Sequence, residues 1–233
     1  MKRFYKTVSI APAGTGFAVL LDGKPVKTPA RNALLLPTER LAAAIAEEWQ
    51  VQGDEIIATS MPLLRLSNTV IDGVAINRED VITAILRFGD NDLLCYRAHH
   101  PPALAQRQQG GWDPLLDWAR QRFSAHMTVA EGLGHVDQSP ETLGALREAL
   151  GNYDAFSLAG LHVIASITGS LVLALAVVEG YIPGAYAFEL SRIDETYQAE
   201  KWGADAEAVK RATALAHELD KAVELIAAVS QKN

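Results

Sequence analysis

The side chains of this sequence that could bind a metal ion include six histidines. His99 and His100 are adjacent, so on a helix or strand they face different directions. No two histidines have the HxxxH or HExxH spacing that places two imidazoles on one helix face. The spacing therefore favours histidines in loops, on the surface or in the core; the other four are His126, His135, His162 and His217. An enzyme whose histidine and carboxylate metal site forms only on folding stays open as the alternative.

The motifs of nucleophilic enzymes and phosphate loops are missing. The one cysteine, Cys95, lies in an apolar run where a thiol behaves as a small hydrophobic group, and a single cysteine excludes a disulfide framework. The sequence has no GxSxG or GxGxxG motif, and Gly14-Thr15-Gly16 lacks the Gly-Lys-Ser/Thr that completes a phosphate loop. We therefore predict no catalytic residue, no cofactor and no metal, and a protein that is not an enzyme.

A segment rich in carboxylates, residues 184–203, has the pattern of a helix with one buried face. Its apolar residues recur every three or four positions, which predicts an inward stripe of Tyr186, Leu190, Ile193 and Tyr197. At ~100° per residue, Glu200 lies within ~20° of Ile193. Glu189 lies on the same flank and Asp194 on the other. Carboxylates so close to a buried stripe must be paired, hydrogen-bonded or at a groove edge. Spacing alone favours a solvated face over a surface that recognises a partner.

The N-terminal part of the chain is expected to form strands followed by helices. Alternating apolar residues predict strands over residues 4–10 and 16–21, and Asp22-Gly23 is a strong hairpin signal. Three helices are then expected, the first capped by Thr38, the second beginning at Pro62 and the third at Asn77.

After residue 98 the pattern predicts only helices. Asp113-Pro114 and Ser139-Pro140 each combine a cap residue with a proline at the first helical position, which predicts two helix starts. Two last helices are expected at residues 184–202 and 205–229.

The predicted fold class is therefore α+β. A small N-terminal α+β domain with antiparallel strands, residues 1–85, precedes a larger all-helical C-terminal domain, residues 86–233. The net charge is −7, which disfavours a nucleic-acid partner because phosphate binding requires a basic surface.

One stretch, Ala155–Val178, has no formal charge over 24 residues and is long enough to span a bilayer. Asp154 and Glu179 flank it where a basic cluster or an aromatic belt would be expected. We therefore predict a buried helix and no membrane insertion. The first residues lack the apolar segment of a signal peptide, so a cytoplasmic location is expected.

Several aromatic and charged residues are expected to serve the fold. Trp49, Trp112 and Trp118 lie on apolar helical faces and are expected in the core. Thr168-Gly169-Ser170 is expected at a close contact between helices. A network of charges linking the domains is predicted among Asp90, Asp92 and Arg97.

Distinctive short stretches run in order from about residue 3 to residue 203. They are Arg3-Phe4-Tyr5-Lys6, Leu21-Asp22-Gly23-Lys24, Lys27-Thr28-Pro29, Glu48-Trp49-Gln50, Met61-Pro62, Arg65-Leu66-Ser67-Asn68-Thr69, Asp90, Asp92 to Arg97, Trp112-Asp113-Pro114-Leu115-Leu116, Thr168-Gly169-Ser170, Asp194-Glu195, Tyr197-Gln198 and Glu200-Lys201-Trp202-Gly203. By their number and order, the chain resembles the family of chaperones that assemble the F(1) sector of ATP synthase by holding its alpha subunit.

The resemblance implies a non-enzymatic assembly chaperone whose partner is the alpha subunit, held until the beta subunit docks. A monomer is expected. Mitochondrial relatives carry a presequence, so the chain is similar to a bacterial, cytoplasmic member. By resemblance to the acidic helix of the family, the expected partner-binding residues are Glu189, Asp194, Glu195, Gln198, Glu200 and Trp202.

Overall fold

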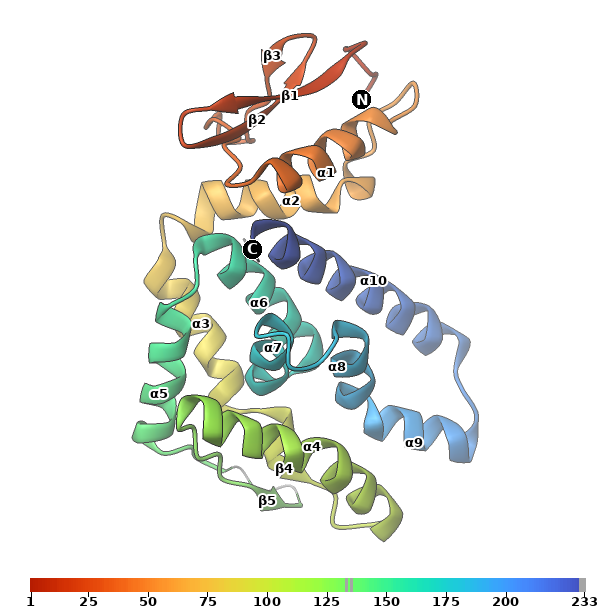
Figure 1. Cartoon of the computed structure of the whole chain (residues 1–233). Helices are drawn as coiled ribbons and strands as arrows, with labels where there is room; N and C mark the ends of the chain where they lie inside the picture. Colours follow the sequence, from red (N-terminus) through yellow and green to blue (C-terminus); the bar gives the residue numbers. More distant parts are fainter. Residues whose placement is uncertain (133, 135, 231–233) are drawn as a thin grey trace. The chain divides into compact units, whose positions relative to one another are not determined.

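The computed structural model describes residues 1–132, 134 and 136–230, so His135 lies outside the described residues (Figure 1). The chain forms two compact units, which are described separately. Unit 1 comprises Met1–Arg78, Asp154–Gly160 and Glu224–Asn233; unit 2 comprises Glu79–Tyr153 and Leu161–Val223. The domain division into residues 1–85 and 86–233 stays a prediction.

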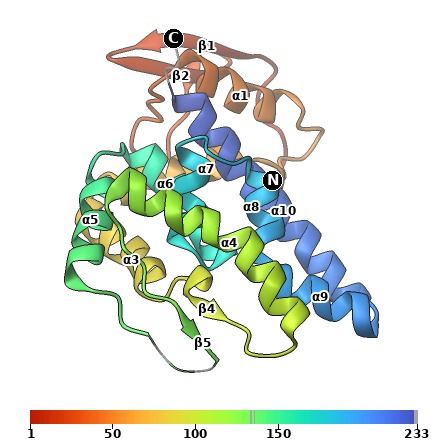
Figure 2. The ribbon, with the colours of Figure 1, turned by 60° about the horizontal axis from the view of Figure 1, so that its bottom comes forward.

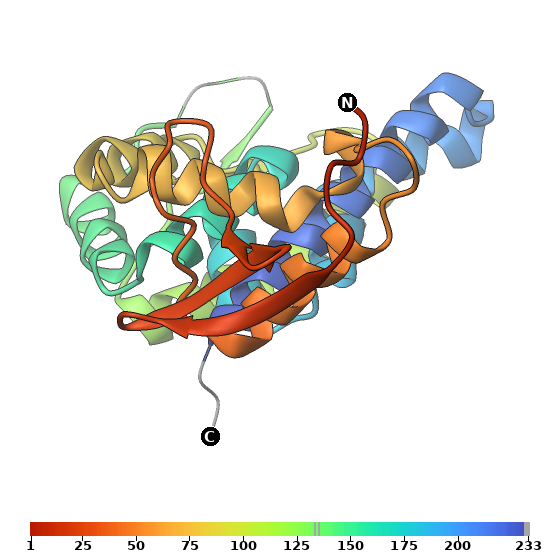
Figure 3. The ribbon, with the colours of Figure 1, turned by 90° about the horizontal axis from the view of Figure 1, so that it is seen from above.

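An antiparallel sheet in the order β1-β2-β3 lies on one side of unit 1 (Figure 3). Its strands are β1 (Val8–Ala13), β2 (Gly16–Leu21) and β3 (Lys24–Pro25). Val8 lies opposite Leu21. The turns need left-handed backbone, with φ +54° at Gly14 and +77° at Gly23, which glycine adopts without a steric penalty. The strand predicted over residues 16–21 and the Asp22-Gly23 hairpin are confirmed. The strand predicted over residues 4–10 was misplaced, because β1 begins at Val8 and continues to Ala13.

Helix α1 (Glu39–Gln50) packs against this sheet, and α2 (Pro62–Thr69) packs against α1 (Figure 1). Thr38 caps α1, as predicted, by accepting a hydrogen bond from the Leu41 amide at 3.2 Å. The core between the layers consists mainly of aliphatic side chains with two aromatic rings: Tyr5, Val19, Leu21, Leu34, Leu36, Leu41, Ile45, Trp49, Met61 and Leu63. Short 3₁₀ and π segments, η1 (Ala58–Ser60) and η2 (Val70–Val74), flank α2.

The N-terminus of α2 is capped by a carboxylate from the neighbouring helix. Met61 makes no side-chain cap. Instead, Glu48 of α1 accepts hydrogen bonds from the amides of Leu63 and Leu64, at 2.7 and 2.8 Å. A carboxylate is favoured there because the first amides of a helix lack partners and carry the positive end of its dipole.

The last turns of α10 (Ala206–Val229) belong to unit 1. Leu225 and Ala228 are buried in the core of this unit. The Thr38 hydroxyl donates to the Ala228 carbonyl at 2.6 Å, and the Arg40 guanidinium donates to the Ala227 carbonyl at 3.2 Å. The start of α1 therefore satisfies carbonyls at the end of the last helix.

The described part of unit 2 is helical apart from a two-residue parallel ladder of β4 (Tyr96–Arg97) and β5 (Ala130–Glu131). Helix α4 (Pro102–Phe123) contacts α5, α7 and α9, and α7 contacts α8 (Figure 2). The other elements are α3 (Arg78–Asp90), η3 (Leu93–Cys95), α5 (Pro140–Gly151), α6 (Ala155–Thr168), α7 (Leu171–Val178), α8 (Gly184–Ser191) and α9 (Ile193–Trp202). The predicted α+β fold class is confirmed.

The uncharged stretch forms two helices, so the expectation of one long helix was wrong. The chain breaks at Gly169, where φ is +67°, and Ser170 caps α7 by accepting from the Leu173 amide at 3.0 Å. The residues of α7 from Leu171 to Val177 are all buried, so the predicted core position is confirmed. Among the described residues, no helix combines the length and the hydropathy needed to cross a bilayer.

Asp92 stabilises this break. Its carboxylate is fully buried and accepts hydrogen bonds from the amides of Leu94 and Val172, both at 3.0 Å, and the Leu93 amide donates to the Gly169 carbonyl at 2.9 Å. The predicted charge network was therefore wrong. Asp92 binds backbone amides, and Arg97 pairs instead with Asp113 at 2.7 Å.

Burial raises the pKa of Asp92 from 3.8 to about 6, although the amide donors oppose this shift. The folded protein therefore holds this proton more tightly than the unfolded chain does. The stability that this proton contributes is complete below pH 4 and is lost as the pH rises to about 6. We expect the unfolding free energy of the wild type, relative to Asp92→Asn, to fall by on the order of 2 kcal/mol across this range. Urea titrations at several pH values test this, and a constant difference would contradict it.

The predicted helix start at Asp113-Pro114 was also wrong, because α4 is continuous from Pro102 to Phe123. The helix begins earlier, after Pro101, and Pro102 occupies its first turn. Pro114 has no N–H, so the Gly110 carbonyl receives no helical bond from it. The predicted start at Ser139-Pro140 is confirmed.

Candidate functional site

The carboxylate-rich segment forms two helices, α8 and α9, which break at Arg192 (φ −117°, ψ 23°). The indole N–H of Trp112 donates to the Leu190 carbonyl at 2.9 Å. In a continuous helix that carbonyl would accept from the Asp194 amide, so α4 takes an acceptor that the helix would otherwise use. The expectation of one helix and one stripe was therefore wrong. Leu190 and Tyr197 are buried, whereas Tyr186 is 45% exposed.

Two carboxylates of α9 bind side chains of α4. Glu200 accepts two hydrogen bonds from the Arg107 guanidinium, at 2.9 and 2.8 Å. Asp194 accepts from the side-chain amide of Gln108 at 2.7 Å. Gln108 is 1% exposed, and its carbonyl oxygen accepts from the Ala98 amide at 2.7 Å. The prediction that carboxylates beside the buried stripe must be paired, hydrogen-bonded or at a groove edge is confirmed for Asp194 and Glu200.

Tyr197 lies between these two contacts. Its ring is buried, with the Arg107 guanidinium 5.2 Å and the Lys201 ammonium 5.6 Å from its centroid, within the range of cation–π attraction. The hydrogen bonds from Arg107 lower the pKa of Glu200, so Glu200 stays ionised at neutral pH. The α4 contacts therefore fix the orientation of a half-exposed negative charge.

The other expected partner-binding residues lie away from α4. Glu195 pairs with Arg192 at 3.4 Å, one turn apart on the chain. Gln198 is exposed, and Trp202 is 79% exposed at the end of α9. Glu189 is exposed on α8, before the break. The structure thus brings Asp194 and Glu200 to one side of α9, with the remaining four residues elsewhere on α8 and α9.

Sequence reasoning missed Arg107 and Gln108, which hold the two carboxylates. A signal for Gln108 was present in the spacing. Leu104, Gln108, Trp112 and Leu115 recur at helical intervals, so a glutamine there occupies a buried position. A buried amide must be hydrogen-bonded, which would have predicted a polar partner.

The five histidines that the structure describes do not converge on one site. Within residues 1–132, 134 and 136–230, no three histidine, cysteine or acidic side chains are grouped so that they could hold a metal ion. The rings of His99 and His100 stack edge to face. His99 lies 3.6 Å from Glu131, and the side chains of His99 and Glu131 are both mostly exposed. Burial lowers the pKa of His162, so its imidazole is neutral at pH 7.

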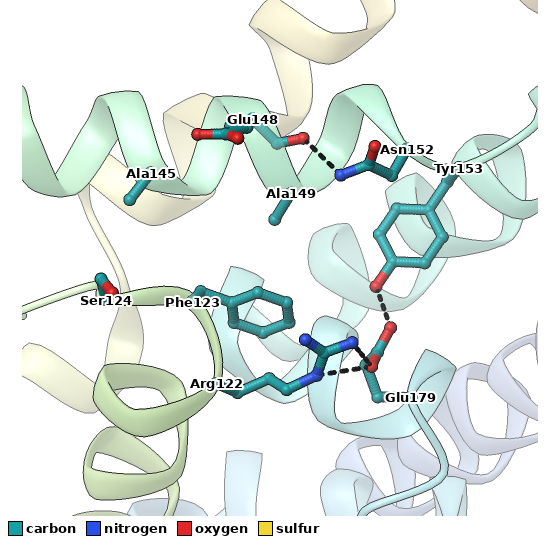
Figure 4. Close-up of a pocket in the computed structure, with 9 residues that line it drawn as sticks. All are labelled: Arg122, Phe123, Ser124, Ala145, Glu148, Ala149, Asn152, Tyr153 and Glu179. Atoms are coloured by element: carbon teal, nitrogen blue, oxygen red, sulfur yellow. Dashed lines mark hydrogen bonds and ion pairs between the residues drawn. The ribbon is translucent and has the colours of Figure 1, made fainter.

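A polar hollow of about 510 Å³ lies among the ends of α4, α5 and α7 (Figure 4). Glu179 accepts from the Tyr153 hydroxyl at 2.6 Å and twice from the Arg122 guanidinium, at 2.8 and 3.0 Å. Burial and the Glu179 contact raise the pKa of Tyr153, so the phenol stays protonated. The hydrogen bonds among these three side chains connect the ends of the helices. This arrangement favours a structural role over a catalytic one.

A surface helix that presents charges in fixed orientations is suited to binding another protein. Comparison with known proteins shows which class of protein this chain belongs to. The family described as ATP12 chaperone protein matches residues 2–120, about half of the chain. The chain is therefore a chaperone.

It belongs to the ATP12 family of chaperones for ATP synthase assembly. The crystal structure of Atp12 from Paracoccus denitrificans is similar, with 41% identity, a TM-score of 0.95 and 98% of each chain covered. The Atu1473 protein of Agrobacterium tumefaciens matches with 41% identity and a TM-score of 0.94, over 98% of this chain and 86% of that one. The mitochondrial protein atp12 of Schizosaccharomyces pombe is 24% identical over 214 residues, 87% of this chain and 74% of that protein.

Proposed function

We propose that this chaperone binds the alpha subunit of the ATP synthase F(1) sector before the beta subunit docks, and that it acts as a monomer. An unassembled subunit exposes the apolar surface that its interface will later bury, and such a surface aggregates. A chaperone that covers this surface lowers the concentration of free subunit by mass action, without a chemical step, and beta displaces it.

The observation that carries the proposal is the anchored surface of α9. Two of its carboxylates, Asp194 and Glu200, are held by α4 in fixed orientations, and Trp202 at its end is 79% exposed. Fixed charges next to an exposed aromatic ring are typical of protein interfaces, where aromatic side chains supply affinity and charges supply specificity. The proposed partner-binding residues are Glu189, Asp194, Glu195, Gln198, Glu200 and Trp202.

Co-expression with the alpha subunit tests this function. We expect the chaperone to keep alpha soluble and to co-purify with it, and added beta subunit to release it. Alpha that aggregates to the same extent with and without the chaperone, and does not co-purify, would contradict the proposal.

Glu200→Lys tests the role of the anchored charge. It places a cation beside Arg107, and we expect about tenfold weaker binding of alpha, because like charges at an interface oppose association. The pair is exposed and solvent screens it, so the unfolding midpoint should change little. Binding is measured by titration of purified alpha, and stability by urea unfolding.

A charge swap separates recognition from anchoring. The double variant Arg107→Glu/Glu200→Arg restores the ion pair but leaves α9 with a cation. If Glu200 contacts alpha, the double variant stays weak; if the pair only anchors α9 to α4, the double variant binds as the wild type does. A Glu200→Lys variant that unfolds but retains its intrinsic affinity would assign the residue to the fold.

A further inference from the structure

A second hollow, of about 190 Å³, lies between α9 and the first turns of α10 within unit 2. Small and apolar side chains form most of its lining: Thr196 and Ala199 from α9, Ala204 from the connection, and Ala208, Val209 and Ala212 from α10. Val209 is 52% exposed. Because alanine has no side chain beyond its methyl group, nothing from either helix fills this space.

The hollow lies on a different face of α9 from the α4 contacts. Glu195, Thr196 and Ala199 line it, whereas Asp194 and Glu200 bind α4. Both faces belong to one helix, so a protein that contacts α9 can use them together.

The exposed Trp202 borders the same face. Trp202 follows Glu195 by seven residues, which places the two side chains within ~20° of each other around the helix at ~100° per residue. Trp202 is 79% exposed. Tryptophan is enriched at the hot spots of protein interfaces, and hot-spot residues bind in pockets, so an exposed tryptophan near this hollow is typical of a binding surface.

The size and the charge of the hollow define what it can hold. A dry apolar cavity of about 150 Å³ binds benzene, so a hollow of this size accommodates one large aliphatic or aromatic side chain. Its charged residues are Arg192, Glu195 and Asp205, one cation and two carboxylates. Arg192 pairs with Glu195, and Asp205 caps α10 by accepting a hydrogen bond from the Ala208 amide at 3.0 Å. The lining keeps one net negative charge, on Asp205, which attracts a cation.

We propose that this hollow receives one large apolar side chain of the alpha subunit, from a segment that also carries a lysine or arginine facing Asp205 and that packs against Trp202. This inference rests on the proposed function, because it names the alpha subunit as the occupant. The hollow supplies the apolar part of the binding surface, from which the partner excludes water. The carboxylates held by α4 supply the charged part.

Filling the hollow tests the proposal. Ala208→Leu introduces an isobutyl group that occupies the space, whereas Ala214→Leu, on the opposite side of α10, adds the same group to an exposed surface. The probe is purified alpha subunit titrated against each full-length variant, with urea unfolding as the stability control. We expect Ala208→Leu and Trp202→Ala each to weaken binding at least tenfold, and Ala214→Leu to bind within twofold of the wild type.

The outcomes separate this inference from the proposed function. If the wild type binds alpha and Ala208→Leu binds equally well, the hollow is empty in the complex and the inference is overturned, while the proposed function stands. If the wild type does not bind alpha, both fail. If Ala208→Leu lowers the unfolding midpoint, Ala199→Leu fills the hollow from α9 and decides in its place: weakened binding supports the inference and unchanged binding overturns it.

Discussion

Replacing Asp92 with alanine is expected to lower the free energy of unfolding by about 3 kcal/mol or more. The substitution leaves the amides of Leu94 and Val172 without their acceptor in a fully buried site. Each unpaired buried donor costs about 1–3 kcal/mol, and removal of the carboxylate also leaves a cavity. The loss falls where α6 ends and α7 begins, so the break between these helices loses its principal support.

Urea unfolding followed by circular dichroism measures the effect. Asp90→Ala is the matched control, because Asp90 is only partly buried at the end of α3 and its loss should change stability by no more than about 0.5 kcal/mol. Equal stabilities for the two variants would show that the Asp92 hydrogen bonds do not hold the break.

Trp112→Ala is expected to destabilise the protein by about 3–5 kcal/mol. The side chain is 1% exposed, and truncation of a buried tryptophan leaves a cavity that the surrounding helices fill only in part. It also removes the indole donor to the Leu190 carbonyl and the ring that lies 5.0 Å from the Arg97 guanidinium. The α8–α9 break should therefore weaken together with the core.

Two further variants separate these contributions. Trp112→Phe keeps most of the buried ring but has no N–H, so it should cost less than the alanine variant while still leaving the Leu190 carbonyl unpaired. Trp202→Ala removes an exposed tryptophan and should change stability by no more than about 0.5 kcal/mol. Equal stabilities for Trp112→Ala and Trp202→Ala would show that the contact between Trp112 of α4 and Leu190 of α8 does not stabilise the protein.

Local sequence signals predicted the fold class well. Alternation gave the β1–β2 hairpin, and cap residues gave the starts of α1 and α5, because these signals act within a few residues of the chain. Trp49 and Trp112 are buried as their helical spacing predicted. Trp118 is only half-buried, because it stacks on the exposed Tyr181 with ring centroids 5.0 Å apart.

The two errors of predicting one helix where the structure has two share a physical cause. The breaks at Gly169 and Arg192 depend on partners distant in sequence: Asp92 and Leu93 bind the first, and Trp112 binds the second. Apolar periodicity continues across both breaks, so local pattern alone predicts continuous helices. The same limit applies to the site. Spacing predicted that Asp194 and Glu200 need partners, but which residues of α4 supply them depends on how the helices pack.

The contact between the start of α1 and the end of α10 has a consequence for biosynthesis. Thr38 and Ala228 are separated by 190 residues, and the core of unit 1 includes Leu225 and Ala228. During translation, unit 1 therefore lacks part of its interior until Leu225 and Ala228 have been made. Since closing so long a loop is slow, we expect the core of unit 1 to stay open in the nascent chain, a state whose exposed apolar surface favours aggregation.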